Sequence, residues 1–485
     1  MDGPSGDNRV VVVFVLLLAS FMDLLHSTIV NVALPAIQVD LQATPEQLEW
    51  IVNGYVLAFA ALLISGGRLG DIFGRKKTFT VGVIGFTLAS ALGTIAGSAD
   101  ILIWARVAQG AFATLMIPQV LSMVQVLFAP KERAGMFGAL GAVSGLAVIA
   151  GPLVGGFLTS ANISGFGWRS IFLINIPIGI MLLIATAISM PGSRSPKALR
   201  LDIPGFILAT AALFLGVYAL IEGRAVSWAP WIWVLLGVSA ALIATFFLYQ
   251  KRIESVGKAV LMPLELFSNR GYSAGIVAQL AFAASVAGFM LVTSLYLQFA
   301  LGFSAMTTGI SLLSFAVGAF VGSIAAVHLG PRLGRPLIIF GALTQIAGYF
   351  WASRIVADMG INLQGSDLTI PFTIAGAGLS LQVVPLTGLT LSNAPVNHAG
   401  VASGVFNTFQ QVGTALGVAL VGVVYFSHAE GAGPTIDTYT ASMWVPLGAL
   451  ALSAVACLML PSNASVQAGK GELINELNDH EIPRP

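Results

Sequence analysis

The chain has 485 residues, of which 56% are hydrophobic and only 9% are charged, and its formal net charge is +1. A soluble domain carries roughly a quarter of charged residues, so this composition excludes an ordinary soluble protein and indicates a membrane protein with many helices. The near-neutral balance argues against a nucleic acid partner. The single cysteine, Cys457, excludes an intramolecular disulfide and a cysteine-cluster metal site, and we expect no metal.

Fourteen apolar stretches are long enough to cross a bilayer, which takes about 20 residues. They begin near residues 10, 46, 77, 101, 135, 171, 203, 230, 272, 305, 337, 370, 400 and 440. No small-residue cleavage site follows the first stretch, so we expect it to persist as a membrane helix rather than to be removed as a signal peptide. The pattern predicts an all-α membrane protein with fourteen spans.

The basic residues predict the orientation of these spans. If the N-terminus is cytoplasmic, eighteen of the 22 Lys and Arg residues fall on the cytoplasmic side and Arg106 lies within the fourth span. Only Arg169, Arg224 and Arg354 fall outside. Because positive charge gathers on the cytoplasmic side of membrane proteins, we expect both termini in the cytoplasm and a multi-pass protein of the cell membrane.

Basic connections after the sixth and eighth spans divide the chain into parts. We expect a six-helix bundle over residues 1–190, a two-helix insert with cytoplasmic linkers over 191–271, and a second six-helix bundle over 272–461. Residues 462–485 are polar and predict a cytoplasmic tail. The remaining loops are too short for a soluble catalytic domain, and no phosphate-binding loop or nucleophile elbow is present, so we expect no enzyme.

The first span contains two ionisable side chains in the stretch "FMDLLHSTIVNVALP" (Phe21 to Pro35). Asp23 and His26 are three residues apart and therefore share one face of a helix. Arg106 lies within the fourth span. Ionisable groups at bilayer depth are costly and mark functional sites by default, although Arg106 could instead reach the outer interface.

The segment "GRLGDIFGRKK" (Gly67 to Lys77) joins the second and third spans. Its glycines allow close approach of the helix ends, and Asp71 and Arg75 can pair across one helical turn. Position for position, it resembles the G-x-L-x-D-x-x-G-R-K-x signature of the major facilitator superfamily. The resemblance implies that Asp71 latches two helical halves together on the cytoplasmic side. The implied gating motif consists of Gly67, Asp71, Gly74, Arg75 and Lys76.

Two further segments carry the resemblance. "LIWARVAQGAFAT" (Leu102 to Thr114) is similar to an arginine-containing element of the superfamily's fourth span, and "GAVSGLAVIAGPLVGG" (Gly141 to Gly156) is similar to the g-x-x-x-G-P-x-x-G-G element of its antiporters. Small residues also serve simple helix packing, which is the alternative interpretation of the second segment. The implied antiporter motif consists of Gly145, Gly151, Pro152, Gly155 and Gly156.

The segments "GWRSIFLINIPIG" (Gly167 to Gly179) and "TIVNVALP" (Thr28 to Pro35) narrow the resemblance to the drug:proton antiporter family with fourteen spans. This family implies the major facilitator fold, with two six-helix bundles plus two additional central-insert helices. "GPRLGRP" (Gly330 to Pro336) after the tenth span echoes the segment after the second, as parallel repeats predict.

The first span departs from this family's pattern F-M-x-x-L-D-x-T-I-V-N-V-A-L-P. His26 occupies the acidic position, and Asp23 places an acid one turn earlier; the sequence leaves open whether His26 is native or an introduced substitution. We expect Asp23, His26 and Arg106 to form a proton-coupling cluster whose groups titrate together, with Asp23 as the carrier. The alternatives are a neutral, hydrogen-bonded His26 and an Asp23 that merely contacts a neighbouring helix.

The implied transport cycle exports a small lipophilic substrate, neutral or weakly cationic, by alternating access in exchange for protons. We expect a mainly apolar cavity with a few polar groups, and no cofactor beyond the proton gradient. Its candidate substrate-binding residues are Asn31, Tyr55, Met116, Gln119, Tyr296, Gln382, Asn407, Gln410 and Gln411. The last three share one face of a helix and could equally bind neighbouring helices.

Two other functions are compatible with the same fold. Translocation of lipids or lipid precursors is the main alternative, and the glycine–proline element argues against the other, a nutrient symporter. The expected partners are the substrate, protons and membrane lipids, and the protein is expected to act as a monomer.

Overall fold

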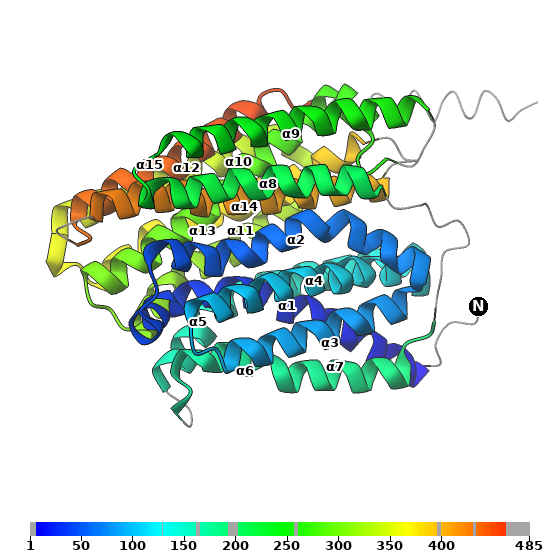
Figure 1. Cartoon of the computed structure of the whole chain (residues 1–485), viewed down its shortest axis with the longest axis horizontal. Coiled ribbons are helices and arrows are strands. Elements are labelled where there is room, and N and C mark those ends of the chain that lie inside the picture. Colours follow the sequence, from blue (N-terminus) through cyan, green and yellow to red (C-terminus); the bar gives the residue numbers. More distant parts are fainter. Residues whose placement is uncertain are drawn as a thin grey trace, which may run out of the picture.

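The computed structural model describes residues 6–128, 130–161, 165–192, 202–256, 260–394, 399–429 and 433–461. Within these ranges the chain is helical, without a β-strand, and the long helices run side by side (Figure 1). The α-helices are α1 (Gly6–Leu41), α2 (Pro45–Phe73), α3 (Arg75–Thr94), α4 (Ala99–Leu127), α5 (Pro130–Ala161), α6 (Ser170–Leu173), α7 (Asn175–Ser189), α8 (Ile203–Ala225), α9 (Pro230–Ser255), α10 (Arg270–Leu295), α11 (Ala305–Leu333), α12 (Arg335–Met359), α13 (Thr369–Ser392), α14 (Ala399–Ala429) and α15 (Ile436–Cys457). The short 3-10 helices are η2 (Gly167–Arg169), η3 (Leu264–Ser268), η5 (Gly360–Asn362) and η6 (Gly365–Leu368), and η4 (Tyr296–Ala300) is a π-helix.

Eleven helical segments among the described residues are long and apolar enough to cross a membrane, and bent α2 makes twelve if its two parts are one span. The all-helical membrane fold predicted from composition is therefore confirmed, but the count of fourteen is not. Each predicted stretch contains a helix, yet α3 and α5 are not among the eleven. α3 opens with three consecutive basic residues and is rich in Gly and Thr, which lowers its hydropathy.

Local sequence explains where the helices begin and end. Thr44 and Gln47 form a reciprocal capping box at the start of α2, and Pro45 occupies the first turn, where its missing N–H costs nothing. Gly74, with φ of 101°, ends α2, and Gly334, with φ of 55°, ends α11. Both residues adopt a conformation that side chains disfavour, so the chain turns sharply there.

The same packing pattern occurs twice along the chain. α2 and α3 pack on α4, while α11 and α12 pack on α13; likewise α1 packs on α5 and α10 on α14. The match extends to single contacts. A Cβ added at Gly67 of α2 would lie 3.6 Å from Cβ of Pro118, and one added at Gly330 of α11 would lie 3.6 Å from Cβ of Pro385. The two sets of six helices are thus built alike.

The two sets meet along α5 with α11, α2 with α14, and α1 with α10. Ser294 Oγ of α10 donates a hydrogen bond to the carbonyl of Asn31 at 2.8 Å, and Gln298 Nε2 donates to the carbonyl of Val32 at 3.2 Å. α8 packs on α9 and also contacts α2 and α14, so it lies beside the junction of the two sets (Figure 1).

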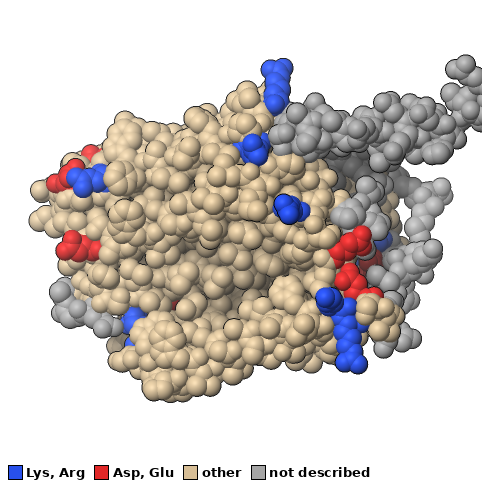
Figure 2. All heavy atoms as spheres, turned by 90° about the horizontal axis from the view of Figure 1, so that it is seen from above, with Lys and Arg blue, Asp and Glu red and all other residues tan. Residues whose placement is uncertain are grey.

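Both ends of the described chain lie at one end of the helices, here named the terminal end. Arg9 near the start of α1 pairs with Glu132 near the start of α5, and Arg335 donates to the carbonyl of Leu460 at 3.1 Å. Figure 2 shows charged side chains gathered toward both ends of the molecule, with a largely neutral surface between them. This distribution is that of a protein whose middle contacts lipid. Cys457 is buried in α15.

Candidate functional site

Asp23 lies midway along α1 and is only 7% exposed. The hydroxyl of Tyr55, from α2, donates a hydrogen bond to its Oδ1 at 2.5 Å. Hydrogen bonds to a charged group are the strong ones, so Tyr55 stabilises the carboxylate form of Asp23. Tyr55 is one of the substrate-binding candidates predicted from the sequence, and in the structure its hydroxyl binds the acid.

Arg106, from α4, lies beside the same tyrosine but forms no ion pair with Asp23. Its Cζ lies 4.4 Å from the centre of the Tyr55 ring, and its Nε donates to the carbonyl of Ile51 at 2.9 Å. The side chain is 1% exposed and therefore does not reach the outer interface. A cation over an aromatic face is attracted by the ring, and more strongly when both are removed from water. Tyr55 thus stands between the acid and the base.

His26 belongs to a second hydrogen-bonded chain that meets the first at Arg106. Its Nε2 lies 2.8 Å from Oε1 of Gln109, which also accepts from Arg106 NH1 at 3.2 Å. Its Nδ1 lies 2.9 Å from Nδ2 of Asn175, at the start of α7. Gln109 Nε2 in turn donates to Ser90 Oγ at 2.8 Å.

These partners fix the form of His26. The amide nitrogen of Asn175 can only donate, so Nδ1 accepts; the carbonyl oxygen of Gln109 can only accept, so Nε2 carries the proton. With the amides assigned in this way, the imidazole is neutral with both nitrogens satisfied. This is the hydrogen-bonded histidine that the sequence left open as an alternative. Asp23 and His26 share a helix face as predicted, but each has its own partner.

Sequence reasoning missed Gln109, Asn175 and Ser90. Gln109 could have been found, because it follows Arg106 by three residues and so shares its face of α4. Asn175 is the first residue of α7, within the segment Gly167 to Gly179, where nothing local ties it to His26. We refer below to Asp23, Tyr55, Arg106, His26, Gln109 and Asn175 as the buried polar cluster.

The gating motif lies at the terminal end, where α2 passes into α3. Arg75 NH2 and Asp71 Oδ1 are 2.9 Å apart, as predicted, but the pair spans the break at Gly74 rather than one continuous turn. Lys76 Nζ donates to the carbonyl of Ala187 in α7 at 3.3 Å. Gly67 faces α4. These contacts fix the α2–α3 turn against its own set of helices.

A neighbouring arginine makes a longer connection from the same motif. Arg68 donates a hydrogen bond to the carbonyl of Val260, in the segment that follows α9. The motif region therefore also contacts the connection that precedes the second set of helices.

The antiporter motif forms a close contact on two sides of α5. A Cβ on Gly151 would lie 1.9 Å from Thr28 Oγ1 of α1, and one on Gly155 would lie 2.8 Å from Ile29 Cγ1. A Cβ on Gly156 would lie 2.6 Å from the carbonyl oxygen of Ala305 in α11.

α11 also approaches α5 closely from its own side, at Pro152 of the motif. A Cβ added at Gly309 of α11 would lie 2.4 Å from the carbonyl oxygen of Pro152. Small residues are thus required where α5 crosses both α1 and α11. The surroundings of Gly145 lie outside the described residues.

Several substrate-binding candidates are engaged inside their own set of helices. Gln119 Nε2 donates to the carbonyl of Gly66 at 2.9 Å, and Gln382 Nε2 donates to Ser453 Oγ at 2.7 Å. Met116 is fully buried. Tyr296 of η4 is 1% exposed and packs on Tyr439 of α15. The candidates that keep some exposure are Asn31, Asn407, Gln410 and Gln411.

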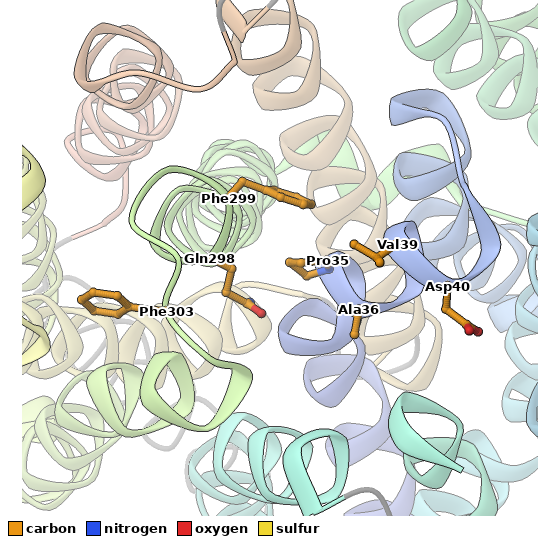
Figure 3. A pocket seen from close by; sticks show the side chains of 7 residues that line it. All are labelled: Pro35, Ala36, Val39, Asp40, Gln298, Phe299 and Phe303. Carbon is orange, nitrogen blue, oxygen red and sulfur yellow. The ribbon is translucent and has the colours of Figure 1, made fainter. Parts of the chain in front are cut away.

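An open cleft of about 660 Å³ lies between α1 and the residues that follow α10, namely η4 and Phe303, away from the buried polar cluster. In Figure 3, Gln298 and Phe299 face Pro35 and Val39 across it. Asp40 also borders the cleft, but its carboxylate accepts from Arg169 NH1 at 2.5 Å and from the Trp168 indole at 3.0 Å. None of the substrate-binding candidates lines this cleft.

Comparison with known proteins identifies the family. The model of the Major Facilitator Superfamily matches residues 16–418. The chain is 38% identical over 413 residues to the "Probable actinorhodin transporter" of Streptomyces coelicolor, covering 85% of this chain and 72% of that protein. It is 37% identical over 409 residues to the "Tetracenomycin C resistance and export protein" of Streptomyces glaucescens, covering 83% and 73%.

A solved structure supports the same assignment at the level of fold. The crystal structure of a D-xylose-proton symporter aligns with a TM-score of 0.65 and 14% identity, covering 94% of this chain and 98% of that one. Superfamily members are transporters rather than enzymes, in agreement with the many apolar helices found here. The chain is therefore a multi-pass membrane transporter that belongs to the major facilitator superfamily.

Proposed function

We propose that the chain is a proton-coupled antiporter that exports a small lipophilic compound. The observation that carries this proposal is the buried polar cluster, in which Asp23, 7% exposed, is hydrogen-bonded to Tyr55 while Arg106 covers the same ring. An acid at that depth is costly to keep unless it has a task. The relatives named above as exporters or resistance proteins support the direction of transport and the class of compound.

The mechanism starts from the two protonation states of Asp23. When Asp23 is ionised, the Tyr55 hydroxyl and the Arg106 guanidinium stabilise its charge. When Asp23 takes up a proton, Arg106 loses its counter-charge and keeps its contact with the Tyr55 ring and its hydrogen bonds to the Ile51 carbonyl and Gln109. Because Asp23, Tyr55 and Arg106 come from α1, α2 and α4, this change in charge balance acts on the packing of three helices at once.

The remaining features of the proposal rest on the charge and hydropathy pattern of the sequence and on its resemblance to the fourteen-span drug:proton antiporters. We place both termini in the cytoplasm, count fourteen spans in two six-helix sets with α8 and α9 as the central insert, and assign the Asp71–Arg75 pair to closure at the cytoplasmic side. The substrate would lie between the two sets, against the partly exposed amides Asn407, Gln410 and Gln411. The absence of an acid from the predicted cavity face of α14 favours neutral or weakly cationic compounds.

Flux measurements in proteoliposomes test the proposal. Asp23→Asn removes the titratable group while keeping its shape, so pH-jump-driven export should be lost and substrate binding largely kept. Asp358→Asn, an exposed acid paired with Arg354 on α12, is the matched control and should export normally. Undiminished flux with normal pH dependence in Asp23→Asn would show that the cluster is structural.

A further inference from the structure

A second buried acid, Glu49, lies outside the buried polar cluster, near the start of α2. Glu49 is 1% exposed, and neither of its carboxyl oxygens has a hydrogen-bond partner among the described residues. Asn53, one turn later on the same face, is fully buried, and both of its amide atoms are likewise unpartnered. Glu49 is six residues from Tyr55, or about 9 Å along α2 at 1.5 Å per residue, toward the end opposite the termini.

Glu49 points at the backbone of the other set of helices. A Cβ added at Gly422 of α14 would lie 2.3 Å from Cδ of Glu49 and within 2.4 Å and 2.5 Å of its two oxygens. The carboxyl group thus fills the space that a side chain at Gly422 would need. The neighbouring glycines Gly413 and Gly417 face α10 instead. The Glu49–Gly422 contact is therefore part of the closure between the two sets.

The charges around this contact disfavour an ionised Glu49. Arg224, at the end of α8, pairs with Glu46 and lies 5.3 Å from the centre of the Phe426 ring. Glu222 is a second nearby acid and accepts from the Trp50 indole at 3.2 Å. The titratable and charged groups at this end of the helices packed on α2 are Tyr218, Glu222 and Arg224 of α8, Asp100 and Arg106 of α4, Asp40 of α1, and Tyr425 and His428 of α14.

We propose that Glu49 is a second proton-binding site, protonated while α2 and α14 are in contact and ionised when they separate. A carboxylate enclosed without a hydrogen bond or a cation is costly, and its protonated form removes that cost. When the contact opens, water reaches Glu49 and the proton leaves to the same side. The proton at Glu49 therefore gates that end and does not cross the membrane.

This proposal is independent of whether Asp23 carries transported protons. It predicts that acidic conditions close the end opposite the termini and alkaline conditions open it. It also predicts that the response survives when Asp23 cannot titrate, which separates its failure from a failure of the proposed antiport.

Electron–electron distance measurements on spin labels report the opening directly. The labels are attached at Gly97→Cys and Ser427→Cys in a Cys457→Ser background reconstituted into lipid nanodiscs. Gly97 has open space around it, and Ser427 is exposed on α14, so both sites tolerate a label at the end opposite the termini. As the pH rises from about 5 to about 9, the distance between the two labels should change from short to long in the protein that keeps Glu49, here called the parent.

Glu49→Gln has the shape of the protonated acid and should hold the short distance at every pH. Gly422→Ala inserts a methyl group where the carboxyl lies and should hold the long distance at every pH. Gly404→Ala, on the same helix but with open space around it, is the control and should respond like the parent. Asp23→Asn should also respond like the parent.

Three outcomes would overturn the proposal. A normal pH response in a well-folded Glu49→Gln protein would show that another group controls the contact. A response abolished by Asp23→Asn would assign it to the buried polar cluster. No pH response in the parent, with Gly422→Ala still short, would show that the contact is permanent.

Discussion

Arg106 and Tyr55 are in face contact, with the guanidinium carbon 4.4 Å from the ring centre, while the hydroxyl of the same ring is bound to Asp23. The tyrosine thus separates a buried base from a buried acid and is in contact with both. Direct neutralisation would make the acid hard to protonate, because a close cation favours the ionised form. An aromatic spacer keeps the attraction but weakens it, which suits a group that must gain and lose a proton.

The first prediction concerns this spacer. Tyr55→Phe keeps the ring under Arg106 and removes only the hydrogen bond to Asp23. A hydrogen bond to a charged group contributes about 1.5–3 kcal/mol. At about 1.4 kcal/mol per pH unit, its loss should move the midpoint of proton-driven flux about one to two units toward higher pH. The measurement is substrate flux in proteoliposomes as a function of pH. An unchanged midpoint would mean that Tyr55 does not stabilise the ionised acid.

The second prediction concerns His26. His26→Asp restores the acid of the family pattern at a place where the amide nitrogen of Asn175 can donate to a carboxylate, and Gln109 can donate as well once its amide is turned over. Export should be kept or strengthened, and its pH dependence should shift downward, because the new carboxyl group lies near Arg106, which favours its ionised form. The same pH series at matched protein level measures this. Loss of flux at all pH values would show that the neutral imidazole is required to hold α1 and α7 together.

Much of the fold was predictable because its causes are local. The lengths of the apolar stretches placed the helices, and the glycine spacing of the fifth stretch predicted the close crossing that Gly151 and Gly155 make with α1. The span count could not be fixed in the same way. α2 bends by 54° and α3 is only weakly apolar, so length and hydropathy alone do not separate a span from a buried helix.

The candidate site was predictable only in part, because tertiary contacts decide its partners. The shared face of Asp23 and His26 follows from helix geometry, but the contact of His26 with Asn175 joins residues 149 positions apart. Gln119 was expected to line a cavity, and its amide is bound to the Gly66 carbonyl. The sequence does not distinguish a buried amide that binds backbone from one that binds a ligand. Glu49 lies at the start of the second apolar stretch and so resembles an ordinary interfacial acid; only its burial against α14 sets it apart.

The third prediction concerns the gating motif. The Asp71 side chain is 40% exposed, and an exposed ion pair contributes only about 0–1 kcal/mol to stability. Asp71→Asn should therefore insert and fold normally. If the pair closes the cytoplasmic side, export should nonetheless fall, and Arg75→Ala should act in the same direction. Flux per inserted molecule is the quantity to measure. Wild-type flux in a well-expressed Asp71→Asn protein would remove the gating assignment.

The last prediction concerns orientation and uses two glycines that have open space around them. Gly97 lies in the turn between α3 and α4, and Gly192 follows α7, so each accepts a cysteine without disturbing packing. With Cys457→Ser as background, a membrane-impermeant maleimide should label Gly97→Cys in intact cells and Gly192→Cys only after permeabilisation. The reason is that basic residues flank the terminal end, where Gly192 lies, and positive charge is retained in the cytoplasm. Equal labelling of both cysteines in intact cells, or the reverse preference, would contradict this orientation and place the Asp71–Arg75 pair on the wrong side for a cytoplasmic gate.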